Sequence, residues 1–198
     1  MKDNILAAKD EKQQKVNHFF STNPNDSLLI IKANIPGPNK NFPFVNYLLK
    51  VFLNNLKTTY SFFIEHYYES YDGPYYFCGI KGKDEKIKRH LINIEETHDL
   101  GRFIDLDYFT LNRQSITRDS LNLPLRKCIL CDNDAIYCAR NKTHKTEKLL
   151  HYIEKTTILY FAELVVDLVD YSIIRELKID NKFGLVSFRS QGSHKDMD

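Results

Sequence analysis

The stretch that decides the fold is YSFFIEHYYESYDGPYYFCGI, residues 60–80. Its two arms, residues 60–68 and 75–80, are rich in aromatic residues, which favour pleated, half-buried strands. Asp72, Gly73 and Pro74 lie between the arms and form a turn signal. The pattern therefore predicts an antiparallel β-hairpin.

Further strands and helices are expected on both sides of this hairpin. Residues 28–33, LLIIKA, form a short buried strand that Pro36 and Pro38 must end. Residues 102–110 alternate like a strand, and we expect residues 115–118 to pair back on them. Because strands and helices alternate irregularly, we expect an α+β fold with a mostly antiparallel sheet and helices packed on it. Apolar spacing predicts helices over residues 1–20, 44–56, 84–96, 146–155 and 157–178.

Composition narrows the class of protein. The 198 residues are 42% hydrophobic, which is enough apolar material for one packed domain with an appendage. The formal net charge of +2 points to neither a nucleic acid nor an anionic membrane as a partner. The opening MKDNILAAKDEKQQK has no apolar run, and the apolar-rich residues 156–179 carry a charge about every turn. We therefore expect a cytoplasmic chain without a secretory signal or a membrane span.

Residues 101–107, GRFIDLD, hold a pair of carboxylates with strand spacing. Side chains alternate between the two faces of a strand, so we expect Asp105 and Asp107 to project to one side. Like charges at this spacing repel unless a cation lies between them, and magnesium takes such oxygen ligands while leaving positions for substrate phosphates. The pair predicts a magnesium-dependent phosphoryl site, or alternatively an exposed strand face that carries two aspartates.

Residues 126–145, RKCILCDNDAIYCARNKTHK, gather thiols and cations. Three thiolates and one imidazole would complete a tetrahedral zinc site, whereas plain structural thiols or a redox-active C-x-x-C pair are the alternatives. Arg126 and Arg140 flank the cysteines and are candidates for binding phosphates through paired hydrogen bonds. His144 is a candidate ligand, acid or structural residue. The zinc ligands would be Cys128, Cys131, Cys138 and His144.

Linked motifs run through this half of the chain. They are G-R-x-x-D-x-D at 101–107, P-x-R-x-C-x-x-C at 124–131 and C-A-R-x-x-x-H at 138–144. Together they resemble the apo-citrate lyase phosphoribosyl-dephospho-CoA transferases, also called holo-citrate lyase synthases. ILAAKDEKQQ (5–14) and NIPGPNKNFP (34–43) resemble the family's opening, so the likeness covers about residues 4–155. One departure is that Lys9 and Lys12 stand where the family tends to have arginine.

The resemblance implies an enzyme with a nucleotidyltransferase-like fold and chemistry. Its donor would be triphosphoribosyl-dephospho-CoA, its acceptor a serine of the citrate lyase acyl carrier (gamma) subunit, and its leaving group pyrophosphate. Asp105 and Asp107 would be the catalytic residues and would bind magnesium. The alternative is a module that binds the carrier protein or a nucleotide without chemistry. Substrate contacts would come from Arg102, Arg126, Arg140 and His144.

The end of the sequence carries a second resemblance. KFGLVSFRSQGSHKDMD, residues 182–198, resembles the beginning of triphosphoribosyl-dephospho-CoA synthase, where that family typically reads K-P-G-L-V-D. Phe183 and Ser187 replace the proline and the aspartate of that pattern. We therefore expect a transferase domain over residues 1–155, followed over 156–198 by a helix and the stub of a truncated synthase domain. The apolar helix is expected to pack on the transferase domain or to form a homodimer with a second copy.

Overall fold

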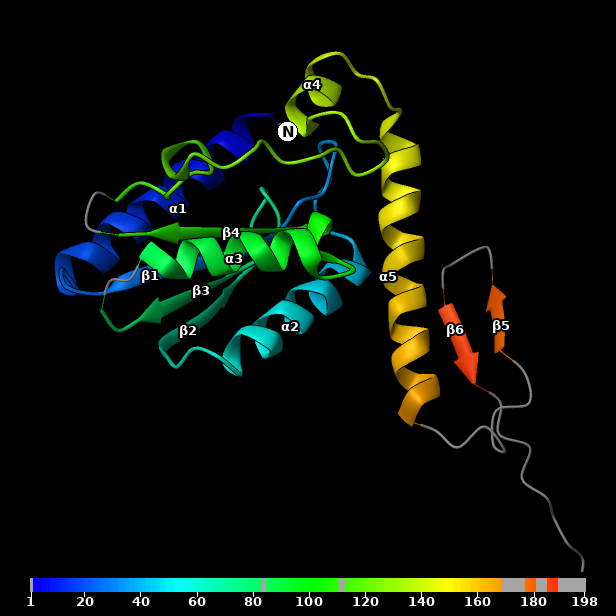
Figure 1. Cartoon of the computed structure of the whole chain (residues 1–198), viewed down its shortest axis with the longest axis horizontal. Helices are drawn as coiled ribbons and strands as arrows, with labels where there is room; N and C mark the ends of the chain where they lie inside the picture. Colours follow the sequence, from blue (N-terminus) through cyan, green and yellow to red (C-terminus); the bar gives the residue numbers. More distant parts are fainter. Residues whose placement is uncertain (1, 83–84, 111–112, 169–176, 181–184, 189–198) are drawn as a thin grey trace, which may run out of the picture.

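The computed structural model describes residues 2–82, 85–110, 113–168, 177–180 and 185–188. Four strands form one antiparallel sheet in the order β2-β3-β1-β4 (Figure 1). The strands are β1 (Ser27–Ala33), β2 (Phe62–Tyr68), β3 (Tyr75–Ile80) and β4 (Ile104–Phe109). The expected α+β class with an antiparallel sheet is confirmed.

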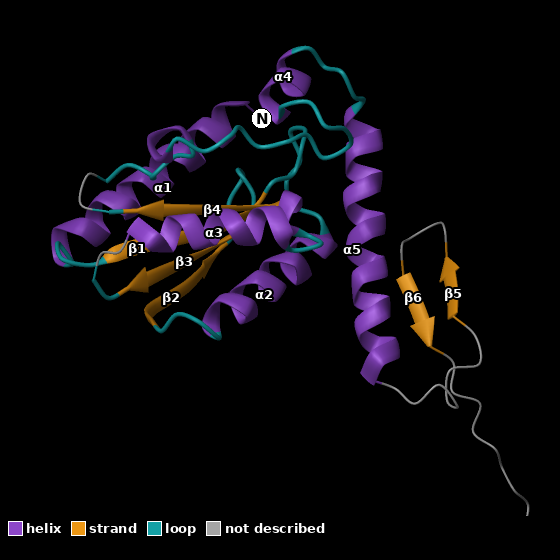
Figure 2. Ribbon diagram, in the orientation of Figure 1, coloured by secondary structure: helices purple, strands orange, loops and turns teal. Residues whose placement is uncertain are grey.

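Helices surround this sheet, as Figure 2 shows. They are α1 (Lys2–Thr22), α2 (Pro43–Lys57), α3 (Glu85–Thr97), α4 (Ala135–Arg140) and α5 (Thr146–Leu168), with 3-10 turns η1 (Gly101–Phe103) and η2 (Asp119–Leu121). Two short strands, β5 (Leu177–Asp180) and β6 (Leu185–Phe188), pair as a separate antiparallel hairpin. Residues 177 and 178 were expected to end a helix, so that bound is wrong, and residues 169–176 of the predicted helix lie outside the described residues.

The hairpin predicted from residues 60–80 is confirmed as β2–β3. Gly73 adopts φ +94° in its turn, a left-handed conformation that favours glycine, and its N–H donates to Ser70 O over 3.0 Å. The second expected pairing is shorter than predicted. Among the described residues of this region, a single bridge joins Phe109, the last residue of β4, to Ser115, and Ile116 N–H also donates to Tyr108 O over 2.8 Å.

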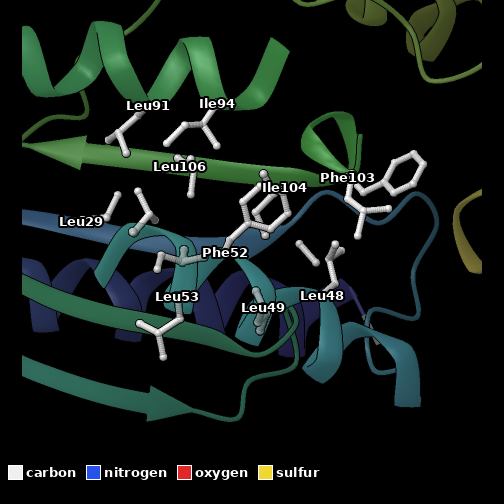
Figure 3. Close-up of a cluster of buried hydrophobic side chains, with 14 of the residues drawn as sticks. Leu29, Leu48, Leu49, Phe52, Leu53, Leu91, Ile94, Phe103, Ile104 and Leu106 are labelled. Carbon is white, nitrogen blue, oxygen red and sulfur yellow. The ribbon is translucent and has the colours of Figure 1, made fainter. Parts of the chain in front are cut away.

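The sheet separates two apolar layers. On one face, α2 and α3 pack on alternate residues of β1 and β4, and Figure 3 shows the side chains that interlock there. Phe52 of α2 and Leu91 of α3 are fully buried in this larger core. On the other face, Phe19 and Phe20 of α1 pack on Ile30 and its neighbours in β3. Burial on both faces explains the apolar run from Leu28 to Ile31 in β1.

The C-terminal part of the described chain contains one long helix where two were predicted. The helices predicted over residues 146–155 and 157–178 are continuous at their junction, where Thr157 is buried and its hydroxyl donates to Ile153 O over 2.7 Å within α5. The expected packing of the second predicted helix on the domain of residues 1–155 is confirmed at Tyr160, which packs against the larger core, and at Phe161, whose ring meets Tyr47 of α2. The proposed boundary between residues 155 and 156 therefore falls inside a continuous helix. In the part of the chain that the structure describes, no helix is both long and apolar enough to cross a bilayer.

Candidate active site

Strand β4 presents two carboxylates on the face of the sheet that α1 covers. Ile104, Leu106 and Tyr108 point into the larger core between the sheet, α2 and α3. Asp105 and Asp107 therefore project to the opposite face, as the alternation predicted. Both side chains are partly exposed, so a ligand can reach them.

A close backbone approach at Gly101 fixes where β4 begins. A Cβ at this position would lie 2.6 Å from the carbonyl oxygens of Ile94 and Glu95 in α3. The N–H of Gly101 donates to His98 O over 2.7 Å, which turns the chain from α3 into η1. The first residue of the G-R-x-x-D-x-D motif is thus a glycine because only glycine lets the carboxylate strand start directly against α3.

Four lysines from α1, β1 and the following loop gather beside the carboxylate pair. Lys32 lies opposite Asp105 in the β1–β4 register, and its ammonium contacts Asp72. Lys12 Nζ in α1 lies 3.6 Å from the same Asp72 carboxylate. Lys40, from the loop after β1, experiences the charges of Lys32 and Asp105. We call this group the lysine cluster, and its members are Lys9, Lys12, Lys32 and Lys40.

The lysine cluster holds more positive charge than its buried partner neutralises. Burial is the main cause that lowers the pKa of Lys32, and the nearby ammonium of Lys12 lowers it further. The pKa of Lys40 is lowered in the same way, by burial and then by Lys32. Burial alone would raise the pKa of Asp72, but the hydrogen bond from Lys32 and the surrounding lysine charges lower it. An added polyanion would relieve the repulsion among the ammonium groups, so the cluster suits phosphate.

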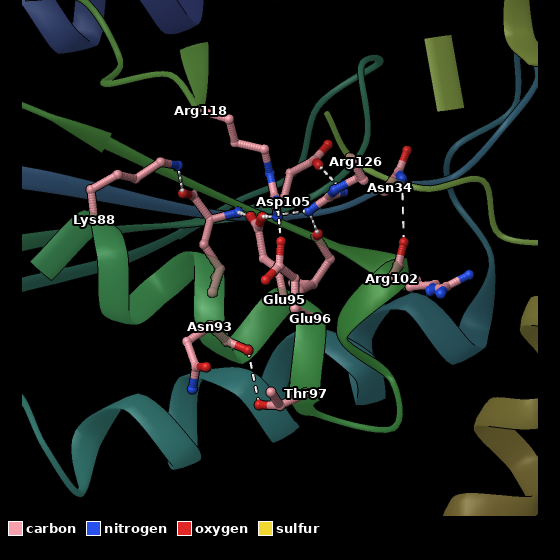
Figure 4. A network of polar contacts seen from close by, with 12 residues as sticks. Asn34, Lys88, Asn93, Glu95, Glu96, Thr97, Arg102, Asp105, Arg118 and Arg126 are labelled. Carbon is pink, nitrogen blue, oxygen red and sulfur yellow. Dashed lines mark hydrogen bonds and ion pairs between the residues drawn. The ribbon is translucent and has the colours of Figure 1, made fainter. Parts of the chain in front are cut away.

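A buried ionic network connects the carboxylate pair to α3 (Figure 4). Glu95 Oε2 lies 2.8 Å from the guanidinium groups of both Arg118 and Arg126. Arg126 also contacts Asp105 Oδ1 at 2.6 Å and donates to Ile104 O over 2.8 Å. Burial alone would raise the pKa of Glu95, but Arg126, the Leu106 N–H and Arg118 together lower it. Glu95 is therefore ionised, and it holds Arg126 against Asp105.

The same helix covers the free edge of β4. Leu106 N–H donates to Glu95 Oε1 over 2.9 Å, and Leu106 O accepts from Lys88 Nζ over 2.7 Å. An unpaired edge would attract other strands, and here side chains satisfy its polar groups. Lys88 is buried, and its ammonium satisfies this carbonyl. Burial lowers its pKa, against the attraction of Glu95 and Asp107.

The carboxylate pair fits magnesium by its chemistry. Partial burial raises the pKa of Asp105, and the negative charges of Asp107 and Glu95 raise it further, against the opposing effect of Arg126. A divalent cation would stabilise both ionised carboxylates at once, since such ions bind oxygen ligands and leave positions for phosphates. Ser115 Oγ donates to Asp107 Oδ1 over 3.3 Å and orients it. Asp105 and Asp107 would therefore hold the ion.

The remaining predicted site residues divide between two places. Arg126 joins the carboxylate pair. Arg102 instead donates through Nη1 to Cys128 O over 2.7 Å, and so ties η1 to the cysteine-bearing loop. His144 lies against Cys131, with 3.3 Å between Nε2 and Sγ. Arg140 is exposed at the end of α4 and takes no part in the contacts around Asp105 among the residues that the structure describes.

A pocket of about 660 Å³ lies between the loop after β1 and the cysteine segment. Lys40 belongs to both the lysine cluster and the lining of this pocket, so the two features adjoin. Lys142 and Lys145 add further positive charge to its wall. The volume is within the usual range of small-molecule sites, which runs from about 300 to 1,000 Å³. The pocket therefore has the size of a small-molecule site, and its lysines can bind phosphate groups.

Several residues of the candidate site were not among those predicted from the sequence. Lys9 and Lys12 were noted only as replacements for arginine, although their spacing of three places them on one helical face. Lys32 alternates with buried residues of β1, and this alternation was the available signal for its side. Glu95 had no local signal, because its partners Arg118 and Arg126 lie more than twenty positions away.

Comparison with known proteins gives the family. A model of the apo-citrate lyase phosphoribosyl-dephospho-CoA transferases matches residues 2–159. The chain belongs to this family. A transferase of this name from Citrobacter koseri is 30% identical over 155 residues, which cover 76% of this chain and 84% of the relative. The resemblance drawn from the three linked motifs is thereby confirmed.

Two other relatives of this transferase family are matched over less of their own length. A protein named CitXG from Leuconostoc mesenteroides subsp. cremoris is 29% identical over 202 residues, covering 94% of this chain and 43% of that protein. A probable transferase from Vibrio cholerae serotype O1 is 40% identical over 86 residues, covering 43% of this chain and 48% of the relative. The chain thus spans less than half of the length of each of these two relatives.

Proposed function

We propose that this chain transfers the phosphoribosyl-dephospho-CoA group from triphosphoribosyl-dephospho-CoA to a serine of the citrate lyase acyl carrier (gamma) subunit. Family membership supports the reaction, and the observation that carries the assignment of its site is the carboxylate pair beside the lysine cluster. A donor with a triphosphate and an acceptor hydroxyl require positive charge for the phosphates and a carboxylate for the metal and the proton. The four lysines and the two aspartates supply these groups.

In the proposed reaction the serine oxygen attacks the phosphate nearest the ribose. A bond forms between this oxygen and phosphorus, the bond from the same phosphorus to the pyrophosphate oxygen breaks, and pyrophosphate leaves with the electron pair. Magnesium held by Asp105 and Asp107 would supply charge neutralisation. The lysine cluster binds the triphosphate and orients it for in-line displacement. Asp105, whose pKa is raised, is the candidate acceptor of the serine proton.

The rest of the donor is assigned to the 660 Å³ pocket. Lys40 lies where the pocket meets the lysine cluster, and Lys142 and Lys145 offer further donors for its phosphate groups. We place the reaction in the cytoplasm, where thiols such as the four free cysteines stay reduced. A nucleotidyltransferase-like origin of the fold stays a prediction.

The test of this function is release of pyrophosphate by the full chain with donor, carrier subunit and magnesium. Transfer requires both substrates, so pyrophosphate should appear only when the donor and the carrier are present together. A binding module would retain the donor or the carrier and release no pyrophosphate. Omission of the carrier, with everything else unchanged, is the matched control.

Lys40 provides a prediction about binding of the donor. Lys40→Gln is expected to raise the KM for the donor roughly 10- to 150-fold with kcat nearly unchanged, because a charge-assisted hydrogen bond contributes roughly 1.5–3 kcal/mol. Lys50→Gln removes the same charge from an exposed position of α2 and serves as the control. Steady-state kinetics with varied donor concentration give both constants. Equal effects of the two substitutions would remove Lys40 from the donor site.

Two further proposals concern the C-terminal part. The match to the Leuconostoc protein covers 94% of this chain and so continues beyond the family model, which ends at residue 159. This extension supports the proposal that residues 156–198 begin a synthase-like segment. Tyr152 and Leu159 of α5 expose large apolar side chains, which supports pairing with a second copy. Sedimentation that finds only monomers at all concentrations would rule out the pairing.

A further inference from the structure

We propose that Cys128, Cys131, Cys138 and His144 bind one zinc ion that fixes the loop beside the carboxylate pair. One ligand atom from each of the four residues lies within 4.8 Å of all the others. The Sγ atoms of Cys131 and Cys138 are 3.5 Å apart, and His144 Nε2 lies 3.3 Å from Cys131 Sγ. Ligands about 2.0–2.3 Å from a tetrahedral zinc ion are separated from one another by roughly 3.3–3.8 Å. The four side chains therefore surround a space of the size that zinc requires.

The backbone of the loop builds the first half of this site. Cys128 N–H donates to Asn133 O, and Ala135 N–H donates to Arg126 O, each over 2.8 Å. These bonds close a tight turn that brings Cys128 and Cys131 to the same side. Backbone N–H groups of Leu130 and Cys131 also donate to the sulfur of Cys128.

Helix α4 and the turn after it build the second half. Cys138 lies within α4, and Thr143 N–H donates to Cys138 O over 3.0 Å. Lys142 adopts φ +48° in this turn, so the chain reverses and returns His144 to the three cysteines. The left-handed backbone conformation of Lys142 costs conformational energy. The turn that requires it brings His144 into contact with the thiols.

A disulfide or plain structural thiols would not explain why all four side chains converge on one point. A disulfide between Cys131 and Cys138 would join two of the sulfurs and leave Cys128 and His144 directed at it without a role. A buried structural thiol needs no such neighbours, as Cys78 illustrates within the larger core. Three thiols and an imidazole that converge on one point are the donor set of a closed structural zinc site.

The zinc ion would act by positioning other residues. Cys128 O accepts from Arg102, and Arg126, two residues earlier, contacts Asp105. Cys128, Cys138 and His144 also line the 660 Å³ pocket. All four coordination positions would be occupied by protein, so the ion would bind no substrate. Its influence on transfer rests on the proposed function, whereas its presence does not.

The experiment is metal analysis of the full chain, expressed with zinc and purified without chelators. We expect one equivalent of zinc in the wild type and in Cys78→Ser, and loss of that zinc in Cys131→Ser and His144→Gln. Cys78→Ser is the matched control, since it removes a buried thiol outside the site. Substoichiometric zinc in folded wild-type protein, or a Cys131–Cys138 disulfide found by mass spectrometry of fresh protein, would overturn the proposal.

If the substituted chains do not fold, the site can still be tested in the wild-type protein by replacing the proposed zinc ion with cobalt. Wild-type protein exchanged into cobalt should show the sulfur-to-metal charge-transfer bands and the intense visible absorption of a tetrahedral thiolate site. Weak absorption typical of octahedral oxygen coordination would contradict the assignment. Neither result depends on transferase activity, so failure of the zinc site and failure of the proposed function can be told apart.

Discussion

Asp105→Asn is expected to lower the rate of transfer about 10³-fold, because a metal-binding carboxylate contributes several kcal/mol to stabilisation of the transition state. Asparagine keeps the shape of the side chain but removes the negative charge and the proton acceptor. Asp107→Asn should show a similar loss, since both carboxylates face the same side of β4. Single-turnover measurement of pyrophosphate release at saturating donor gives the effect on the chemical step.

The same substitution should leave the fold intact. The pKa of Asp105 is raised above its ordinary value of 3.8, so above that raised value the ionised carboxylate costs folding free energy. The native state binds the proton more tightly, and this contribution to stability is present at low pH and is lost as pH rises through the folded pKa. At neutral pH Asp105→Asn should therefore leave the free energy of unfolding unchanged or higher, while Arg126 keeps its contact with Glu95.

Glu65→Gln is the matched control for this prediction. Glu65 also lies on a strand of the sheet and pairs with a lysine, Lys57, at 2.7 Å, but it belongs to the opposite edge strand. Its substitution should change neither transfer nor stability by much, because exposed ion pairs contribute about 0–1 kcal/mol. Transfer rates of Asp105→Asn within a few-fold of this control would show that the carboxylate pair is not the catalytic centre.

Glu95→Gln is expected to lower the free energy of unfolding by about 3 kcal/mol, because removal of one partner leaves buried charges uncompensated. The side chain of Glu95 is only 5% exposed, and both Arg118 and Arg126 depend on it. The neutral amide could still accept from Leu106 N–H, but it cannot balance two guanidinium groups. Urea denaturation of the wild type and the variant measures the loss.

The neighbouring residue provides a control with the same helix and the same partner. Glu96 also contacts Arg118, but its side chain is 51% exposed, so Glu96→Gln should cost less than about 1 kcal/mol. The pKa of Glu95 lies below its ordinary value of 4.5, so its contribution is present above pH 4.5 and is lost as pH falls through the lowered folded pKa. The difference between wild type and Glu95→Gln should shrink over that range. Equal costs at residues 95 and 96 would contradict the network.

Sequence reasoning succeeded where the signal was local. Alternation along β4 placed Asp105 and Asp107 on one side, and aromatic arms around a turn predicted the β2–β3 hairpin. The cysteine motif likewise placed Cys131 near His144, because only a short helix and a turn separate them. In each case the information lies within about twenty residues of sequence.

Contacts between residues far apart in the sequence could not be predicted from local patterns. Lys32 meets Asp72 across forty positions, and their contact follows from the β1–β3 register. The burial of Lys88 depends on the free edge of β4, which only the assembled sheet defines. The helices predicted over residues 146–155 and 157–178 form one helix at their junction, where the Thr157 hydroxyl donates to Ile153 O. The lysine cluster could not be predicted for the same reason, since three separate elements compose it.

Mass spectrometry of the intact apo carrier subunit tests the central claim most directly. The carrier would be incubated with donor, magnesium and either wild-type protein, Glu65→Gln or Asp107→Asn. We predict a gain of one phosphoribosyl-dephospho-CoA group with the first two proteins and no gain with the third over the same time. A carrier whose mass stays unchanged with folded, donor-binding wild-type protein would contradict the account and identify the chain as a binding module.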